Sequence, residues 1–231
     1  MRWFNRTPPS EPDPTFLELL SDHGLAAFER QAAFTDRVGD RDWQLDQERG
    51  ILTFGDDLSF PAQVLGSEAD RSRTWLWAWA NESVEPMLTE RAAAAREIGQ
   101  QRGITVLSDP QVDLDRVGEA YLLVMATAGL LEASAYYPCP YPGGAAYVLL
   151  ELPRQASFDR APAERAARTV ARAVEQVPIL VSRRSIERYL HLIGAAATFD
   201  PDAIRVDEIV TFRFDEYGRL TDLEATLEAA P

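Results

Sequence analysis

The chain has 231 residues, of which 46% are hydrophobic, and it carries a formal net charge of −14. This length and this apolar fraction predict a folded protein of one large domain or two small ones, and they exclude a disordered chain. The negative charge argues against a general nucleic-acid binder, because affinity for phosphates comes from clustered basic residues. No apolar run approaches the roughly 18 residues that a membrane helix needs, so we expect no membrane span.

The N-terminal stretch MRWFNRTPPSEPDP predicts a flexible arm over residues 1–14, because it is rich in proline and polar residues. It lacks the apolar segment of a signal peptide. Cys139 is the single cysteine, so no internal disulfide can form. From these features we expect a cytoplasmic protein.

Positive charge is concentrated in residues 154–192, which carry eight arginines and four acidic residues. All 23 basic residues of the chain are arginine, which excludes lysine chemistry such as Schiff bases. Rows of arginine on the outer faces of helices are ordinary, so we interpret this segment as solvated helix surface. The alternative is a basic patch with a function of its own.

The first predicted helix covers about residues 15–38, where Gly24 interrupts the apolar stripe and leaves one or two helices open. DWQLDQERGILTFG then predicts a hairpin that turns at Gly50. LSFPAQVLGS predicts a third strand, with Pro61 at its start or at an edge. A fourth strand follows in TWLWAWAN.

Two more helices are predicted next, over residues 84–102 and about 115–131. Ser83 or Asn81 is expected to cap the first of them, and the second is apolar enough to lie at the centre of the fold. YYPCPYPGG then predicts a tight aromatic loop, and AAYVLLEL predicts a buried strand.

The last part, residues 157–231, predicts a helix from Pro162 to about Val177, a short helix from Ser185, and a final hairpin. One side of the hairpin is apolar, with Val206, Val210, Phe212 and Phe214. A lone hairpin is only marginally stable, so we expect this part to dock on residues 15–153 with its arginine rows outward.

The order of these elements lacks the regular alternation of strand and helix that parallel sheets require. It predicts an α+β fold. We expect an antiparallel sheet of about four N-terminal strands plus later strands, packed with several helices.

Tryptophan is concentrated in TWLWAWAN, residues 74–81, which holds three of the five tryptophans of the chain. In a strand, Trp75, Trp77 and Trp79 share one face, and leucine and alanine occupy the other. Both faces are apolar, which predicts an interior strand. The tryptophan face forms a thick core layer, the interpretation we favour, or it lines a ligand cavity.

This stretch also carries a resemblance. QVLGSEADRSRTWLWAWANES, followed by a helix and REIGQQRGITVL, resembles an uncharacterised bacterial family, a domain of unknown function marked by a W-x-W-A-W-A-N strand. The resemblance covers residues 15–153 and includes the hairpin DWQLDQERGILTFG. It implies no activity and transfers no functional residues.

Sequence patterns for catalysis and metal binding are not found. The chain has no G-x-S-x-G, G-x-G-x-x-G or Walker motif. His23 and His191 stand alone in the sequence, and Cys139 has no cysteine partner. We therefore expect no metal, no cofactor and no catalytic residue.

Two functional hypotheses follow. The first, which we prefer, is a non-catalytic binding or interaction protein. It would bind a small apolar ligand in a cavity formed by Trp75, Trp77, Trp79 and Asn81 with Tyr137 at the rim, or a basic partner protein, such as a toxin, on its acidic surface. The second is an enzyme that acts on a small molecule in the same cavity with a buried carboxylate or histidine.

Overall fold

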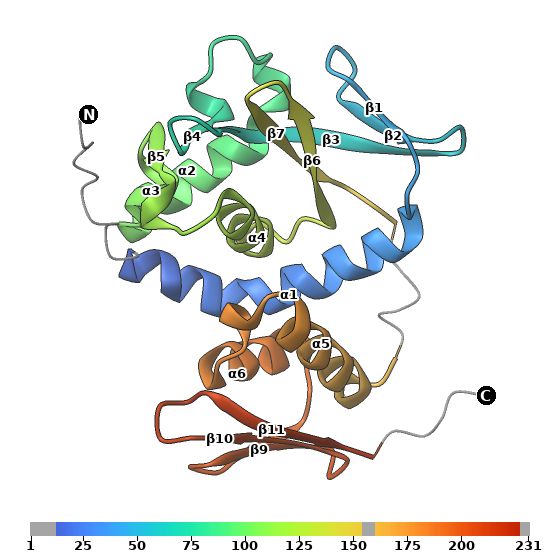
Figure 1. Ribbon diagram of the computed structural model, residues 1–231, viewed down its shortest axis with the longest axis vertical. Helices are drawn as coiled ribbons and strands as arrows, with labels where there is room; N and C mark the ends of the chain where they lie inside the picture. Colours follow the sequence, from blue (N-terminus) through green and yellow to red (C-terminus); the bar gives the residue numbers. More distant parts are fainter. Residues whose placement is uncertain (1–12, 154–159, 227–231) are drawn as a thin grey trace, which may run out of the picture.

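The computed structural model describes residues 13–153 and 160–226. These residues form six α-helices and two antiparallel sheets, one of seven strands and one of four, so the α+β prediction is confirmed. Figure 1 shows the long helix α1 crossing the middle of the molecule, with one sheet above it and the other below. The later strands thus divide between two sheets, where the sequence led us to expect one.

Helix α1 (Pro14–Val38) is a single uninterrupted helix. Gly24 does not split it; a Cβ at this position would lie 2.7 Å from Cδ2 of Leu180, so the glycine allows close packing. Asp13 caps the helix by accepting hydrogen bonds from the backbone N–H groups of Thr15 and Phe16. Residues 1–12 of the predicted arm lie outside the described residues, and the last two residues of that arm begin the fold.

The Asp13 cap is also an ion pair, because Nη2 of Arg116 lies 2.7 Å from its carboxylate. Burial alone would raise the pKa of Asp13, but hydrogen bonds from Thr15, Arg116 and Phe16 outweigh burial and hold the pKa below its usual value. A carboxyl group with a depressed pKa stabilises the fold above its unfolded-state pKa, and this contribution is lost as pH falls.

We therefore expect Asp13→Ala to lower the free energy of unfolding by about 1 kcal/mol at pH 7. The difference from the wild type should shrink at pH 3, below the unfolded carboxyl pKa of about 3.9, because the wild-type carboxylate is then being protonated. Urea unfolding of both proteins at the two pH values measures this. A difference that does not change with pH would contradict the role of the charged cap.

The seven-stranded sheet is built around β3 (Leu58–Ala69). Its main path runs β1 (Trp43–Asp46), β2 (Ile51–Phe54), β3, β4 (Thr74–Trp77) and β5 (Gln111–Asp113); β7 (Gly144–Leu150) pairs with β3 and with β6 (Ala135–Tyr141). The hairpin with its turn at Gly50 and the third strand are confirmed. Pro61 lies inside β3, where the partner changes from β2 to β7, and not at the strand start.

The prediction of a loop in YYPCPYPGG is wrong, because most of these residues form strand β6. Pro138 and Pro140 occupy alternate positions, so their missing N–H groups fall on the same side of the strand. β6 pairs only with β7 and is therefore an edge strand, where a strand tolerates proline. Cys139 between them is buried in the sheet and is not a turn residue.

The helix expected over residues 84–102 begins later, as α2 (Glu90–Arg102). Pro86 opens a separate 3-10 turn, η2 (Pro86–Leu88), and Thr89 follows this turn as the N-cap residue of α2. After the short α3 (Thr105–Ser108), the central apolar helix is α4 (Ala120–Leu130). It starts five residues later than predicted, after Gly118 with a φ of 82°, and its central position is confirmed by its buried residues.

The C-terminal part consists of α5 (Pro162–Gln176), α6 (Arg183–Leu192) and a four-stranded sheet. That sheet runs β11 (Leu220–Ala225), β10 (Val210–Phe214), β9 (Ala203–Val206) and β8 (Ala197–Phe199). The predicted hairpin is β10–β11, and β8 and β9 are additions that the sequence did not show. The four apolar residues expected on one side are all buried, as predicted: Val206, Val210, Phe212 and Phe214.

One apolar core joins the two parts. α1 contacts α4 on one side and α5 and α6 on the other. The buried cluster includes Trp75 and Leu123 from the first part as well as Tyr189 and Phe212 from the second. Within the described residues, no helix combines the length and the apolar character needed to cross a membrane.

Candidate functional site

The tryptophan strand is shorter than predicted. β4 lies between β3 and β5, which makes it an interior strand, and Trp75 and Trp77 share one face. The chain leaves the sheet at Ala78, so Trp79 belongs to the 3-10 turn η1 (Ala78–Ala80) and the prediction is wrong for this residue. The strand ends there because its ladder with β5 stops at Leu76 and its ladder with β3 stops at Trp77.

Trp75 and Trp77 are fully buried, with 0% of each side chain exposed. Their rings meet edge to face at 5.5 Å. Nε1 of Trp77 donates a hydrogen bond to the carbonyl of Val106 at 3.0 Å, whereas Nε1 of Trp75 is buried without a partner. Trp79 is half-buried under the guanidinium of Arg96, 4.4 Å from the ring centre. This geometry is that of a packed core layer.

Asn81 and Tyr137 lie in different surroundings. The Asn81 side chain accepts hydrogen bonds from the N–H and hydroxyl of Ser83. It thus holds a local turn and does not cap α2, which starts at Glu90. Tyr137 packs against Trp43 and Phe54, beside the second core cluster under the β1–β2 hairpin. The residues predicted for one binding site therefore divide between separate regions.

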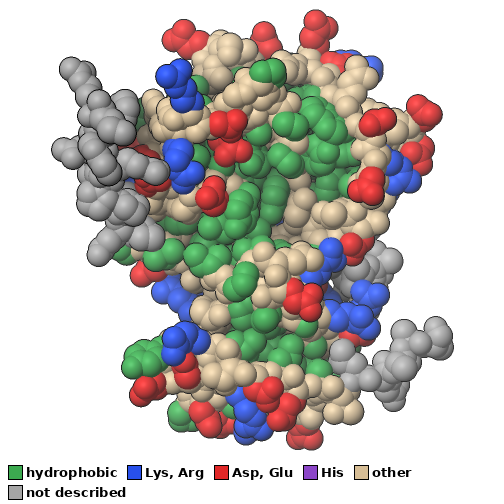
Figure 2. Space-filling model, in the orientation of Figure 1, with side chains coloured by type: hydrophobic (Ala, Val, Ile, Leu, Met, Phe, Trp, Pro, Cys, Tyr) green, Lys and Arg blue, Asp and Glu red, His purple; other side chains and the backbone are tan. Residues whose placement is uncertain are grey.

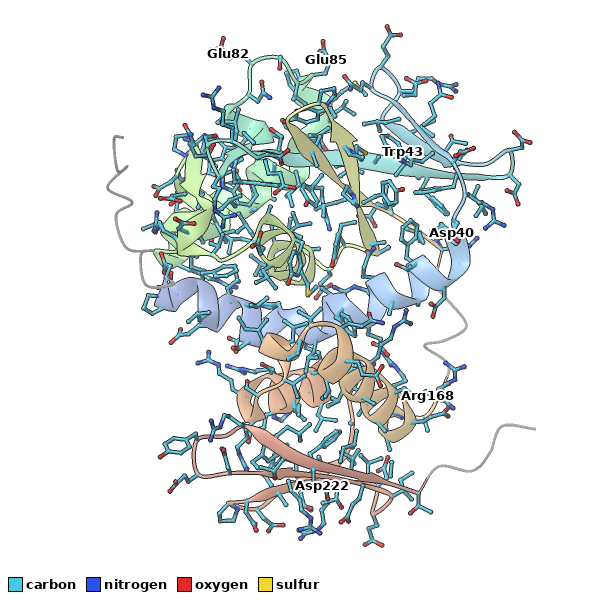
Figure 3. The ribbon with its side chains drawn as sticks, viewed as in Figure 1. Asp40, Trp43, Glu82, Glu85, Arg168 and Asp222 are labelled. Carbon is cyan, nitrogen blue, oxygen red and sulfur yellow. The ribbon has the colours of Figure 1, made fainter. Side chains whose placement is uncertain are left out.

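A different feature has the form of a binding site. Between α1 and α5 lies a cavity of about 850 Å³, which we call the α1–α5 cavity. Its lining includes three acidic residues, Glu29, Asp36 and Glu175, and a larger set of arginines: Arg37, Arg160, Arg165, Arg168 and Arg172. Figure 2 shows basic side chains gathered on the right edge of the molecule, at the height of α1 and α5. Figure 3 labels Arg168 on this side.

Two ion pairs join the helices that line this cavity. Arg165 donates two hydrogen bonds of 2.8 Å to the carboxylate of Glu29, and both side chains are largely buried. Arg172 binds Asp36 in the same two-point manner, at 2.9 and 3.1 Å. Glu29 and Asp36 are seven residues apart on α1, as are their partners on α5. A spacing of seven residues brings side chains back to the same face of a helix, so these pairs fix the register of the two helices.

The remaining arginines have unused capacity for an anion. Arg160 and Arg168 share one carboxylate, that of Glu164, at 3.3 and 2.8 Å. Arg37 lies over the Phe60 ring at 5.6 Å and has no carboxylate partner within the described part of the chain. In addition, Nε of Arg172 is buried without a hydrogen-bond acceptor. The cavity is therefore cationic in a chain whose net charge is −14.

The guanidinium groups determine which ligands this lining can recognise. Guanidinium groups recognise carboxylates and phosphates through paired, charge-assisted hydrogen bonds. Among the described residues that line the cavity there is neither histidine nor cysteine. The hydroxyl of Thr169 accepts a hydrogen bond of 3.0 Å from the buried Tyr189. It is thus engaged in the core.

A second, smaller cavity of about 320 Å³ lies between α1 and α6. It is lined by Asp22, His23, Arg188, His191 and Leu192, so the fold brings both histidines of the chain to one place. Burial lowers the pKa of His23, which favours its neutral form, while Asp22 acts in the opposite direction. Within the described residues, no group of three or more histidine, cysteine and acidic side chains has a geometry able to hold a metal ion.

The interpretation of the arginine segment as solvated helix surface is wrong in part. Arg165 faces α1 and not the solvent, and Arg184 on α6 likewise binds Asp22 in a two-point ion pair. A signal for this arrangement is present: Asp22, Glu29 and Asp36 recur every seven residues and form an acidic stripe along α1. A basic helix elsewhere in the chain is the natural complement of such a stripe.

Comparison with known proteins identifies one relationship. The model of a family of unknown function, DUF6882, matches residues 17–153, more than half of the chain. No curated protein and no solved structure matches. The chain belongs to this family; the match includes nearly all of α1 and ends before α5.

Proposed function

We propose, for this member of a family whose function is unknown, that the protein is a non-catalytic binding protein that takes an anionic small molecule into the α1–α5 cavity. The observation that carries the proposal is the cationic lining of this cavity in a strongly acidic chain. The ligand would present a carboxylate or a phosphate to the guanidinium groups.

The arrangement of the arginines supports this proposal. Arg165 and Arg172 are held by their ion pairs, so they form fixed walls. Arg37, Arg160 and Arg168 offer N–H groups whose charge is only partly compensated. Donors that are already oriented bind an anion at a smaller entropic cost than free side chains do.

The proposal retains one of the hypotheses drawn from the sequence and changes its ligand. A binding protein remains the preferred class, but the full burial of Trp75 and Trp77 moves the site away from the tryptophan strand. The cavity lining supports an anion in place of an apolar ligand or a basic partner. We also propose that the protein acts in the cytoplasm, since its single cysteine forms no internal disulfide.

Calorimetric titration with inorganic phosphate, pyrophosphate and citrate at low salt tests the proposal. We expect saturable binding by the wild type that weakens as salt is added. The double variant Arg37→Gln, Arg168→Gln should weaken it about a hundredfold, because each charge-assisted hydrogen bond contributes about 1.5–3 kcal/mol.

The matched control is Arg213→Gln. This arginine is half-exposed on the outer face of the small sheet and pairs with Asp222 and Glu224. The Arg213→Gln variant should bind each anion with the affinity of the wild type. The proposal fails if the wild type binds none of the three anions, or if the control loses binding to the same degree.

A further inference from the structure

On the α1 side, the wall of the α1–α5 cavity between the two ion pairs is apolar. Ala32 and Ala33 lie there between Glu29 and Asp36, whereas the α5 side carries Arg168, Thr169 and Ala171. Positions 29, 32, 33 and 36 follow the helical repeat, so the alanines lie on the same face of α1 as the two acids. A strip of small apolar side chains thus runs from one ion pair to the other.

The ion pairs frame this strip. Glu29 binds Arg165 and Asp36 binds Arg172, so the two pairs are seven residues apart on each helix. Seven residues correspond to about 10.5 Å along a helix axis. The cavity therefore has a short apolar strip on α1, with an ion pair at each end of the strip and the arginines of α5 opposite it.

The size of the cavity argues against a bare inorganic ion as its natural occupant. About 850 Å³ lies in the range of pockets that hold small organic molecules. An ion would engage the guanidinium groups and leave the alanine strip in contact with water. Only a ligand with an apolar part would remove that strip from water, which is favourable.

We propose that the α1–α5 cavity binds an amphipathic acid, with one carboxylate or phosphate head on the arginines and an apolar chain or ring along the alanine strip. This inference rests on the proposed function, because it names the class of ligand for the same site. Carboxylate and phosphate heads share the chemistry that guanidinium recognises.

Matched pairs of ligands test the apolar part. Calorimetric titrations compare acetate with octanoate and inorganic phosphate with octyl phosphate, all below the concentrations at which micelles form; 1-octanol is the uncharged probe. A buried methylene of about 0.8 kcal/mol multiplies affinity roughly fourfold. We therefore expect octanoate and octyl phosphate to bind at least tenfold more tightly than their short counterparts, and octanol to bind far more weakly than octanoate.

Two variants test whether the alanine strip causes the tighter binding of the long ligands. Ala32→Leu fills the strip and should remove the advantage of the long ligands while inorganic phosphate still binds. Ala94→Leu, at a half-buried position of α2 outside the cavity, should keep that advantage. If Ala32→Leu fails to fold, the wild-type comparison still decides the question.

The outcomes separate the two proposals. Equal affinity for short and long ligands overturns the amphipathic ligand and leaves the anion site in place. Octanol that binds as well as octanoate also overturns it, because the head would then be irrelevant. If neither the phosphate nor the carboxylate ligands bind, the proposed function falls together with the inference.

Discussion

Replacing Trp77 with alanine is expected to lower the free energy of unfolding by about 3–5 kcal/mol, the usual cost of deleting a large buried aromatic side chain. Trp77 is 0% exposed, packs against Trp75 and donates a hydrogen bond to Val106. The vacated space lies beside α3, which contains Val106. Urea unfolding followed by circular dichroism measures the change. Trp79→Ala should cost less, since Trp79 is only half-buried.

A matched pair of phenylalanine variants gives a sharper test of the same core layer. Trp77→Phe removes the donor that satisfies the Val106 carbonyl, whereas Trp75→Phe removes an N–H that has no partner. Both rings are fully buried. We expect Trp77→Phe to be more destabilising than Trp75→Phe by about 1–2 kcal/mol, the cost of leaving a buried polar group unpaired. Equal costs, or the reverse order, would show that the hydrogen bond does not decide the difference.

The second large effect is expected from a chain that ends after Pro153. Its loss of α5, α6 and the small sheet would uncover the face of α1 that now packs against them, including the surface over Gly24 that Leu180 covers. It would also leave the acidic stripe of α1 without its arginines. We expect this truncated chain to aggregate or to bind a hydrophobic dye that the full chain does not bind.

Two measurements accompany the truncation. The full chain in 0.5 M salt is the control, because screening weakens the ion pairs but leaves the apolar core that joins the two parts. It should stay compact and bind no dye. A truncated chain that remains monomeric, with the melting temperature of the full chain, would show instead that the two parts fold independently.

The sequence by itself determined the features that depend on one segment. Periodicity located α1, and a glycine with freedom to adopt positive φ placed the hairpin turn at Gly50. The uniformly apolar composition of α4 predicted its central position, because such a helix cannot face water. Alternation placed Phe212 and Phe214 on the buried side of β10. In each case the side chains of a single element carry the information.

The ends of β4 and the nature of β6 were decided by their partners. The alternation of tryptophan continues to Trp79, but hydrogen bonding to β3 and β5 does not, so the strand stops at Trp77. Three prolines made residues 136–142 look like a loop. An edge strand tolerates proline, however, because no neighbouring strand needs the missing N–H groups on its outer side. A strand is held by hydrogen bonds to neighbouring strands. The local sequence pattern does not show where those neighbouring strands end.

The sequence shows the acidic stripe along α1, but only the tertiary structure decides what pairs with it. Glu29 and Arg165 are separated by 136 residues, and so are Asp36 and Arg172. Each helix alone shows only charged residues and alanines at helical spacing, which is typical of a solvated surface. The cavity exists only where α1 and α5 lie side by side, and this depends on which helices the fold brings together.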